Sequence, residues 1–72
     1  MECDYRGYRI IAIGVANRTF DRWTPNASYH PVDGPSDLSK QITGAIGGAS
    51  SEKKAEITAL GLAKAEIDRR NP

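Results

Sequence analysis

The apolar positions of this chain follow a strand-like alternation in its first part and a helix-like repeat in its last part. Residues 5–16 are rich in aromatic and β-branched residues, which favour a β-strand. Because successive side chains of a strand point to opposite faces, this run divides into Tyr8, Ile10 and Ala12 on one face and Arg9, Ile11 and Ile13 on the other. Both faces carry apolar residues, so the alternation alone leaves the buried face open.

A second strand is predicted around Trp23 and Tyr29, after a turn at Asn17-Arg18-Thr19. Trp23, Ala27 and Tyr29 fall on one face and polar residues on the other, which is typical of a half-buried strand. Pro25 interrupts the pattern and cannot donate a ladder hydrogen bond. The strand is therefore expected at a sheet edge, or with a bulge at this point.

Residues 31–37 form a loop by composition, and a third, weaker strand is predicted over residues 38–46, with Leu38, Ile42 and Ile46 as its apolar members. The run from Gly44 to Gly48 then leads into the last segment. A glycine-rich turn before a helix is a feature of phosphate-binding loops. This run lacks the Gly-Lys-Ser/Thr ending of a P-loop and the spacing of a dinucleotide fingerprint, so an ordinary turn is expected.

Residues 50–71 predict one long, alanine-rich helix. Ser50 or Ser51 can cap its start, while Arg69 and Arg70 favour its C-terminal end. At about 100° per residue, one broad stripe of this helix is apolar. The stripe consists of Ile57, Ala59, Leu60, Ala63 and Ile67.

A single terminal helix cannot bury its apolar stripe alone, so it must lie on the sheet that precedes it. We therefore predict an α+β fold, in which a three-stranded antiparallel sheet is packed by one long C-terminal helix (βββα), as a single domain over residues 1–72. The small residues Ala59 and Ala63 imply a close approach of helix to sheet, and we expect Trp23 to pack against them.

Length and composition argue against an enzyme. A chain of 72 residues buries only about 60% of its unfolded surface, which leaves little room for a deep active-site cavity. The one cysteine, Cys3, excludes an internal disulfide, and Cys3 and His30 are too few soft ligands for a structural zinc site. We expect no catalytic residue, no metal and no cofactor.

The sequence gives no indication of a membrane or secreted protein. No stretch approaches the roughly 20 apolar residues of a membrane span. The first residues lack the basic region and the apolar core of a signal peptide. An unpaired cysteine fits a reducing compartment, so a cytoplasmic location is expected.

Four arginines are the candidate contact residues for a nucleic acid or a protein partner: Arg6, Arg9, Arg18 and Arg22. They are interleaved with aromatic residues in the first two strands, an arrangement that suits phosphate contacts and base stacking. Glu2, Asp4 and Asp21 lie among them, and the formal charge of +1 is far from the strongly basic balance of a nucleic-acid domain. A solvated sheet face of mixed charge is the favoured interpretation.

Short motifs carry two resemblances. Tyr5-Arg6-Gly7-Tyr8, Trp23 in the second strand and Ile67-Asp68 in the helix resemble short bacterial domains of unknown function that begin Tyr-x-Gly-Tyr. More distantly, the order of three strands and a helix is similar to DNA-binding domains of the AP2 and phage-integrase arm-binding type. The first resemblance implies no activity, and the second implies that the sheet contacts DNA.

The leading hypothesis for function is a non-enzymatic protein-interaction or accessory domain. One sheet face stays free of the helix, and Ile11, Ile13 and Val15 are candidates to lie on it. An exposed apolar patch of this kind usually marks an interface. The partner is either an unidentified protein or a second copy of the chain. The alternative, from another class, is nucleic-acid binding through the four arginines.

Overall fold

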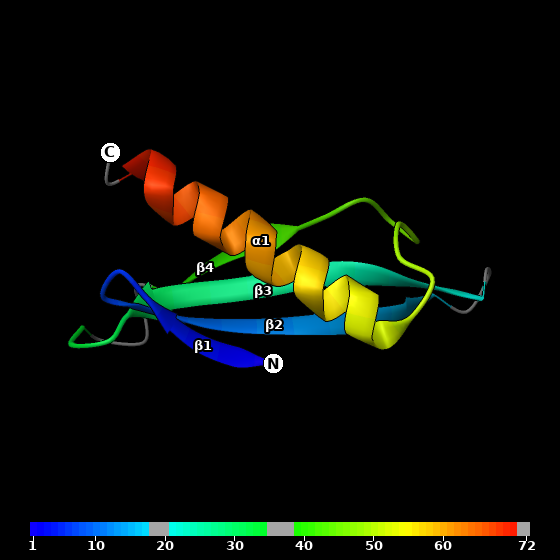
Figure 1. The fold of residues 1–72 in the computed structure, drawn as a ribbon, viewed down its shortest axis with the longest axis horizontal. Coiled ribbons are helices and arrows are strands. Elements are labelled where there is room, and N and C mark those ends of the chain that lie inside the picture. Colours follow the sequence, from blue (N-terminus) through cyan, green and yellow to red (C-terminus); the bar gives the residue numbers. More distant parts are fainter. Residues whose placement is uncertain (18–20, 35–38, 71–72) are drawn as a thin grey trace.

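The computed structural model describes residues 1–17, 21–34 and 39–70. Its elements are β1 (Glu2–Tyr5), β2 (Tyr8–Asn17), β3 (Arg22–Pro31), β4 (Lys40–Thr43) and α1 (Glu52–Arg70). The strands form one antiparallel sheet in the order β1-β2-β3-β4, and α1 crosses one face of it (Figure 1). The predicted α+β class and the C-terminal helix are confirmed, but the described residues form four strands and not three.

The additional strand, β1, lies at the start of the predicted first strand and before it, because residues 2–17 form a hairpin that turns at Arg6 and Gly7. Arg6 and Gly7 both have positive φ, 49° and 84°, as a two-residue type I′ turn requires. Tyr5 and Tyr8 pair directly across this turn. Arginine is not among the residues that commonly take this conformation, so the turn is not obvious from the sequence.

The sheet buries the face of β2 that carries Ile10 and Ala12, both fully inaccessible to solvent. In the register of β2 and β3, Ile10 pairs with Tyr29 and Ala12 with Ala27. All four side chains belong to one cluster with buried residues of α1. The structure thus settles which face of β2 lies against the helix.

The helix α1 begins at Glu52, directly after one of the two serines that were predicted to cap it. The Ser51 hydroxyl accepts a hydrogen bond from the Lys54 backbone N–H at 3.1 Å, which caps the first turn. The buried side chains form a row four residues apart, namely Ala55, Ala59, Ala63 and Ile67. Ile57 was predicted to join them, but it is 54% exposed. That prediction is wrong because a residue two positions from the row lies on the opposite side of a helix.

Small residues bring the helix very close to the sheet. A Cβ atom added at Gly14 of β2 would lie 2.9 Å from Ala55 Cβ and 3.0 Å from the Glu52 carbonyl oxygen. Real Cβ atoms do not approach other atoms so closely, so only glycine fits at this position. The layer between helix and sheet is consequently thin.

Trp23 does not occupy the place expected for it. Its backbone exchanges two hydrogen bonds with Ala49, at 2.9 and 3.0 Å, and its side chain is only half-buried. The core cluster around Ala59 and Ala63 contains Tyr29 and does not include Trp23. The prediction that Trp23 packs against these alanines is therefore wrong, because Trp23 lies at the start of β3, four residues before Ala27.

The second and third predicted strands also need correction. Pro25 lies in β3, a central strand, but β4 pairs with β3 only from Asn26 onward. Next to Pro25, the Gly44 N–H donates a hydrogen bond to the Pro25 carbonyl at 2.9 Å. Because the ladder with β4 does not extend to Pro25, it requires no backbone N–H at this position, and proline is tolerated. Ile46 lies beyond the end of β4 and is 80% exposed. Leu38 lies outside the described residues.

Candidate functional site

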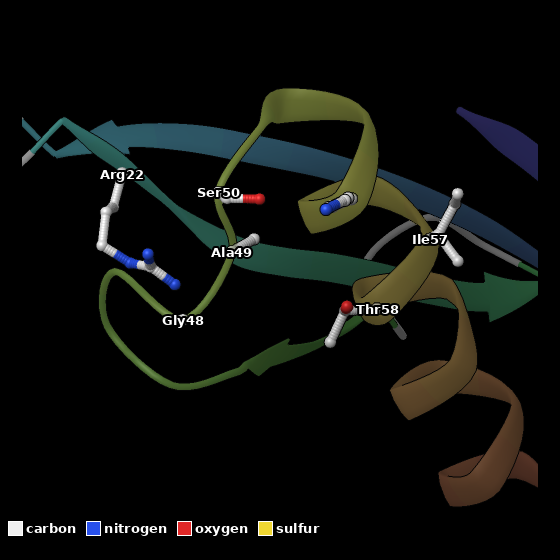
Figure 2. A pocket seen from close by; sticks show the side chains of 7 residues that line it. Arg22, Gly48, Ala49, Ser50, Ile57 and Thr58 are labelled. Carbon is white, nitrogen blue, oxygen red and sulfur yellow. The ribbon is translucent and has the colours of Figure 1, made fainter.

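An open cleft of about 380 Å³ lies beside the start of α1 (Figure 2). It is lined by Arg22, Gly48, Ala49, Ser50, Lys54, Ile57 and Thr58. Arg22 and Lys54 give the cleft two positive charges. None of the described lining residues is a His, Cys, Asp or Glu, so Lys54 is the one side chain in the lining that could act as a base for the hydroxyl of Ser50 or Thr58.

The backbone around this cleft is already hydrogen-bonded within the chain. The Gly47 N–H donates to the Thr24 hydroxyl at 2.9 Å, and the Gly48 N–H donates to the Ala45 carbonyl at 2.9 Å. Arg22 Nε donates to the Gly47 carbonyl. The glycines therefore close a turn and do not form a cradle of free N–H groups of the kind that binds phosphate.

A row of apolar side chains lies on the opposite face of the sheet, which we call the open face. Ile11, Ile13 and Val15 alternate along β2 with the residues that face the helix, and they are 40%, 46% and 43% exposed. The separation of two residues places their side chains next to one another on one face of the pleated strand. The open face thus exposes three β-branched apolar side chains in line.

On the β3 side, the side chains that flank this row are polar but uncharged, whereas Glu2 of β1 pairs with Ile11 on the other side. Thr24, Asn26 and Ser28 of β3 pair directly with Val15, Ile13 and Ile11. On β4, Gln41 pairs with Ser28 and Thr43 with Asn26, which extends the same face. An apolar centre without charges, next to polar side chains that can donate and accept hydrogen bonds, is the usual composition of the central part of a protein interface.

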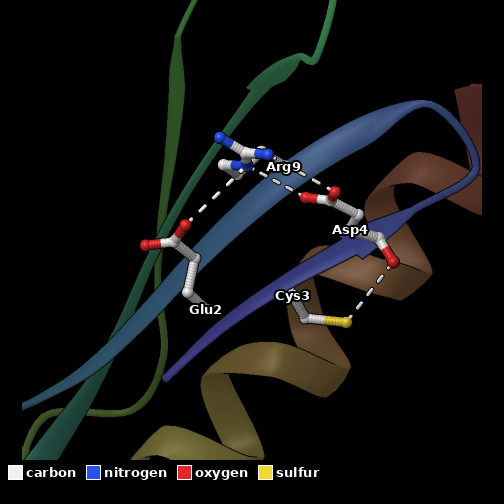
Figure 3. Close-up of polar contacts among 4 residues, drawn as sticks. All are labelled: Glu2, Cys3, Asp4 and Arg9. Carbon is white, nitrogen blue, oxygen red and sulfur yellow. Dashed lines mark hydrogen bonds and ion pairs between the residues drawn. The ribbon is translucent and has the colours of Figure 1, made fainter.

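Charged side chains gather at one end of the open face (Figure 3). Arg9 of β2 pairs across the sheet with Asp4 of β1, and its Nε lies 2.9 Å from Asp4 Oδ1 and 3.8 Å from Glu2 Oε1. The hydrogen bond from Arg9 holds the pKa of the Asp4 carboxyl below its ordinary value. Two carboxylates therefore surround the single positive charge of Arg9, and the cluster carries a net charge of −1.

Arg6 lies on the other side of the molecule and ties the β1–β2 turn to the end of α1. Arg6 Nη1 donates to Asp68 Oδ1 at 2.9 Å. The Tyr5 hydroxyl donates to the same carboxylate, 2.8 Å and 3.0 Å from its two oxygens. The hydrogen bonds from Arg6 and Tyr5 lower the pKa of Asp68. This motif fixes the hairpin against the helix.

The structure does not bring the candidate arginines together. Arg9 stands on the open face, Arg6 contacts the C-terminal part of α1, and Arg22 lies at the far end of β3, bonded to the loop before α1. Arg18 lies outside the described residues. Sequence reasoning missed Asp4 as a partner of Arg9 because it missed β1. The Arg6-Gly7 pair between two tyrosines was the available signal for a hairpin.

The described part of the chain holds no metal-binding cluster and no membrane-spanning helix. Within residues 1–17, 21–34 and 39–70, no three His, Cys, Asp or Glu side chains lie where they could hold a metal ion. Over the same ranges, no helix is both long enough and apolar enough to cross a membrane. Comparisons with family models, curated proteins and solved structures found no match.

Proposed function

We propose that this chain is a non-enzymatic interaction module that binds a protein through its open face. The observation that carries the proposal is the row of Ile11, Ile13 and Val15, exposed by 40% to 46% on the face away from the helix. Apolar side chains that lie contiguously on a surface mark interaction sites far more often than scattered ones do. The single thiol, Cys3, suits a reducing compartment, so we assign the module to the cytoplasm.

The energetics of the row support reversible binding. Full burial of a Val or Ile side chain stabilises by about 1.5–3 kcal/mol, so removing the remaining exposure of each of the three would contribute roughly 1 kcal/mol. The neighbouring Thr24, Asn26 and Ser28 can form hydrogen bonds to a partner without the cost of burying a charge. This combination favours binding to a surface that is itself apolar in its centre.

Nucleic-acid binding is our second choice. Arg6 and Arg9 are each within 2.9 Å of a carboxylate of the same chain, so their charges are partly neutralised. Binding to phosphates requires a set of uncompensated cations on one surface and weakens steeply with salt. A fluorescence-anisotropy titration with mixed DNA and RNA at low salt tests this alternative, and a salt-sensitive rise in anisotropy would favour it over the proposal.

An affinity capture with two matched variants tests the proposed function. The tagged wild-type chain, Ile13→Lys and Ile57→Lys are each incubated with lysate of the source cell, and the retained proteins, copies of the chain included, are quantified by mass spectrometry. Ile57 is an apt control because it is an isoleucine of similar exposure, 54%, on α1. We expect at least one protein to be retained by the wild type and Ile57→Lys and lost with Ile13→Lys.

The proposal is wrong if the retained proteins do not depend on Ile13. Circular dichroism of each variant must match that of the wild type, so that a loss of binding reports the surface and not the fold. Loss with Ile57→Lys alone would move the binding site to the helix side of the molecule and would also contradict the proposal.

A further inference from the structure

In β2, small residues face the helix and larger apolar residues face away from it, whereas a strand usually buries its larger apolar residues. Toward the helix, Ile10 is followed by Ala12 and then by Gly14, because the close approach of α1 leaves room only for small side chains. Away from the helix, the same strand carries larger β-branched residues at every alternate position, of which Ile13 is the most exposed at 46%. The strand therefore places more apolar volume outside the core than its small inner residues place within it.

The core on the helix side is correspondingly poor. Six of the nine buried apolar residues among the described positions are alanines, and Ile10, Tyr29 and Ile67 are the larger ones. Side chains as small as alanine remove little apolar surface from water. A small domain with a limited core is often stabilised by oligomerisation. The face that offers further burial is the open face.

We infer that the open face binds the open face of a second copy of this chain. The two sheets stack to form a homodimeric sandwich, with the two helices on its outer sides. This inference rests on the proposed function, because it names a second copy as the protein that the open face binds. Two sheets that pack face to face cross at about −30°, the angle set by their own twist.

The area of the open face suits a weak dimer. Strands lie about 4.8 Å apart and rise about 3.3 Å per residue, so two strands of ten residues (β2 and β3) and two of four (β1 and β4) present roughly 440 Å². Two copies would bury roughly 900 Å², which is in the range of weak, transient interfaces. The dimer is therefore expected to dissociate on dilution.

The charges of the open face permit contact between identical surfaces. Its centre at Ile13 holds no charged side chain among the described residues, and at one end Arg9 lies between the carboxylates of Asp4 and Glu2, which leaves that end with one net negative charge. Two copies whose strands run in opposite directions place these ends far apart, so the like charges do not meet. Since a two-fold contact places one residue opposite itself, and Ile13 is the middle of the apolar row, the symmetry axis passes near Ile13.

Light scattering after size exclusion tests the dimer. The wild type is loaded from about 1 µM to about 1 mM, a range that covers the affinities expected of so small an interface. We expect the mass to rise from one chain to two across this range. Ile13→Lys should weaken self-association by about tenfold or more, as central interface residues do, whereas Ile57→Lys should leave it within about twofold.

Cysteine cross-linking locates the axis and does not require that a lysine be tolerated in the sheet. Cys3→Ser with Ile13→Cys should form a covalent dimer rapidly under mild oxidation, because the two thiols face each other. Cys3→Ser with Ile57→Cys is the control, since position 57 faces solvent on α1. The Ile57→Cys chain should cross-link only slowly, at a rate proportional to protein concentration.

A wild-type mass of one chain at the highest concentration would overturn the inference, as would equal cross-linking rates at positions 13 and 57. If the chain is monomeric but still captures another protein in a manner that depends on Ile13, the inference fails and the proposed function stands. If neither self-association nor capture depends on Ile13, both are wrong.

Discussion

The closest contact between helix and sheet, at Gly14, gives the sharpest test of the fold. In Gly14→Ala the new methyl group would lie 2.9 Å from Ala55 Cβ and 3.0 Å from the Glu52 carbonyl oxygen. Carbon atoms in favourable contact lie about 3.5–4.0 Å apart. The helix would therefore have to move away from β2, and the neighbouring alanine contacts would loosen with it.

The magnitude follows from two opposing effects. Replacing glycine by alanine in a strand stabilises by roughly 0.5–1 kcal/mol through the unfolded chain. Overpacking a close contact costs about 1–3 kcal/mol. Because one of the clashing atoms is a backbone oxygen that cannot rotate away, we place the overpacking at the upper part of its range. Gly14→Ala should lower the free energy of unfolding by about 1–2 kcal/mol.

Gly61→Ala is the matched control. Gly61 lies within α1, and a Cβ atom there would have no neighbour within 4 Å. This variant should therefore stabilise by about 1 kcal/mol through helix propensity alone. Urea unfolding followed by circular dichroism, at one fixed protein concentration, measures both variants. A Gly14→Ala chain as stable as the wild type would refute the close packing of α1 on β2.

Three further variants test local features. Gly7→Ala should lower the free energy of unfolding by roughly 1 kcal/mol, because an L-residue adopts the φ of 84° at this position only with strain. No atom lies within 4 Å of the new Cβ, so the loss would report the backbone conformation alone. An unchanged midpoint of urea unfolding would contradict the positive φ of the β1–β2 turn. Ala63→Leu should cost about 1–3 kcal/mol by overpacking a fully buried position, and a stabilised variant would show that the layer has spare volume. The pKa of Asp68 is lowered in the folded chain by Arg6, so the unfolded chain takes up the proton first as the pH falls. The stabilisation of the folded state by the ionised Asp68 is therefore complete above about pH 4 and is lost as the pH falls through the folded pKa. Asp68→Asn should therefore lose less stability than the wild type between neutral pH and about pH 3, and equal losses would be inconsistent with this carboxylate's role.

Local signals in the sequence predicted the helix well. Its start depends on Ser51, which caps the first turn, and its end on the basic residues Arg69 and Arg70, all of which act within one or two turns. Ala59, Ala63 and Ile67 were predicted to be buried, and they are. These features need no information from distant parts of the chain.

Features that depend on contacts between distant segments were harder to predict. The hairpin at Arg6-Gly7 was missed, and with it the pairing of Asp4 with Arg9. The sequence also left open which face of the first strand is buried, because that choice depends on where the helix lies. The sequence indicated the apolar row of the open face, but its uncharged neighbours on β3 and β4 could be identified only from the register of these strands.

The central claim is that the open face is covered in solution, and solvent paramagnetic relaxation of methyl groups tests it most directly. A neutral gadolinium chelate is added to isotope-labelled wild-type chain at a concentration where the dimer is expected to dominate. In the isolated chain Ile13 is 46% exposed and Ile57 is 54% exposed, so their methyl signals would broaden to a similar degree. The account predicts that Ile57 broadens strongly while Ile11, Ile13 and Val15 are protected, and equal broadening of Ile13 and Ile57 would contradict it.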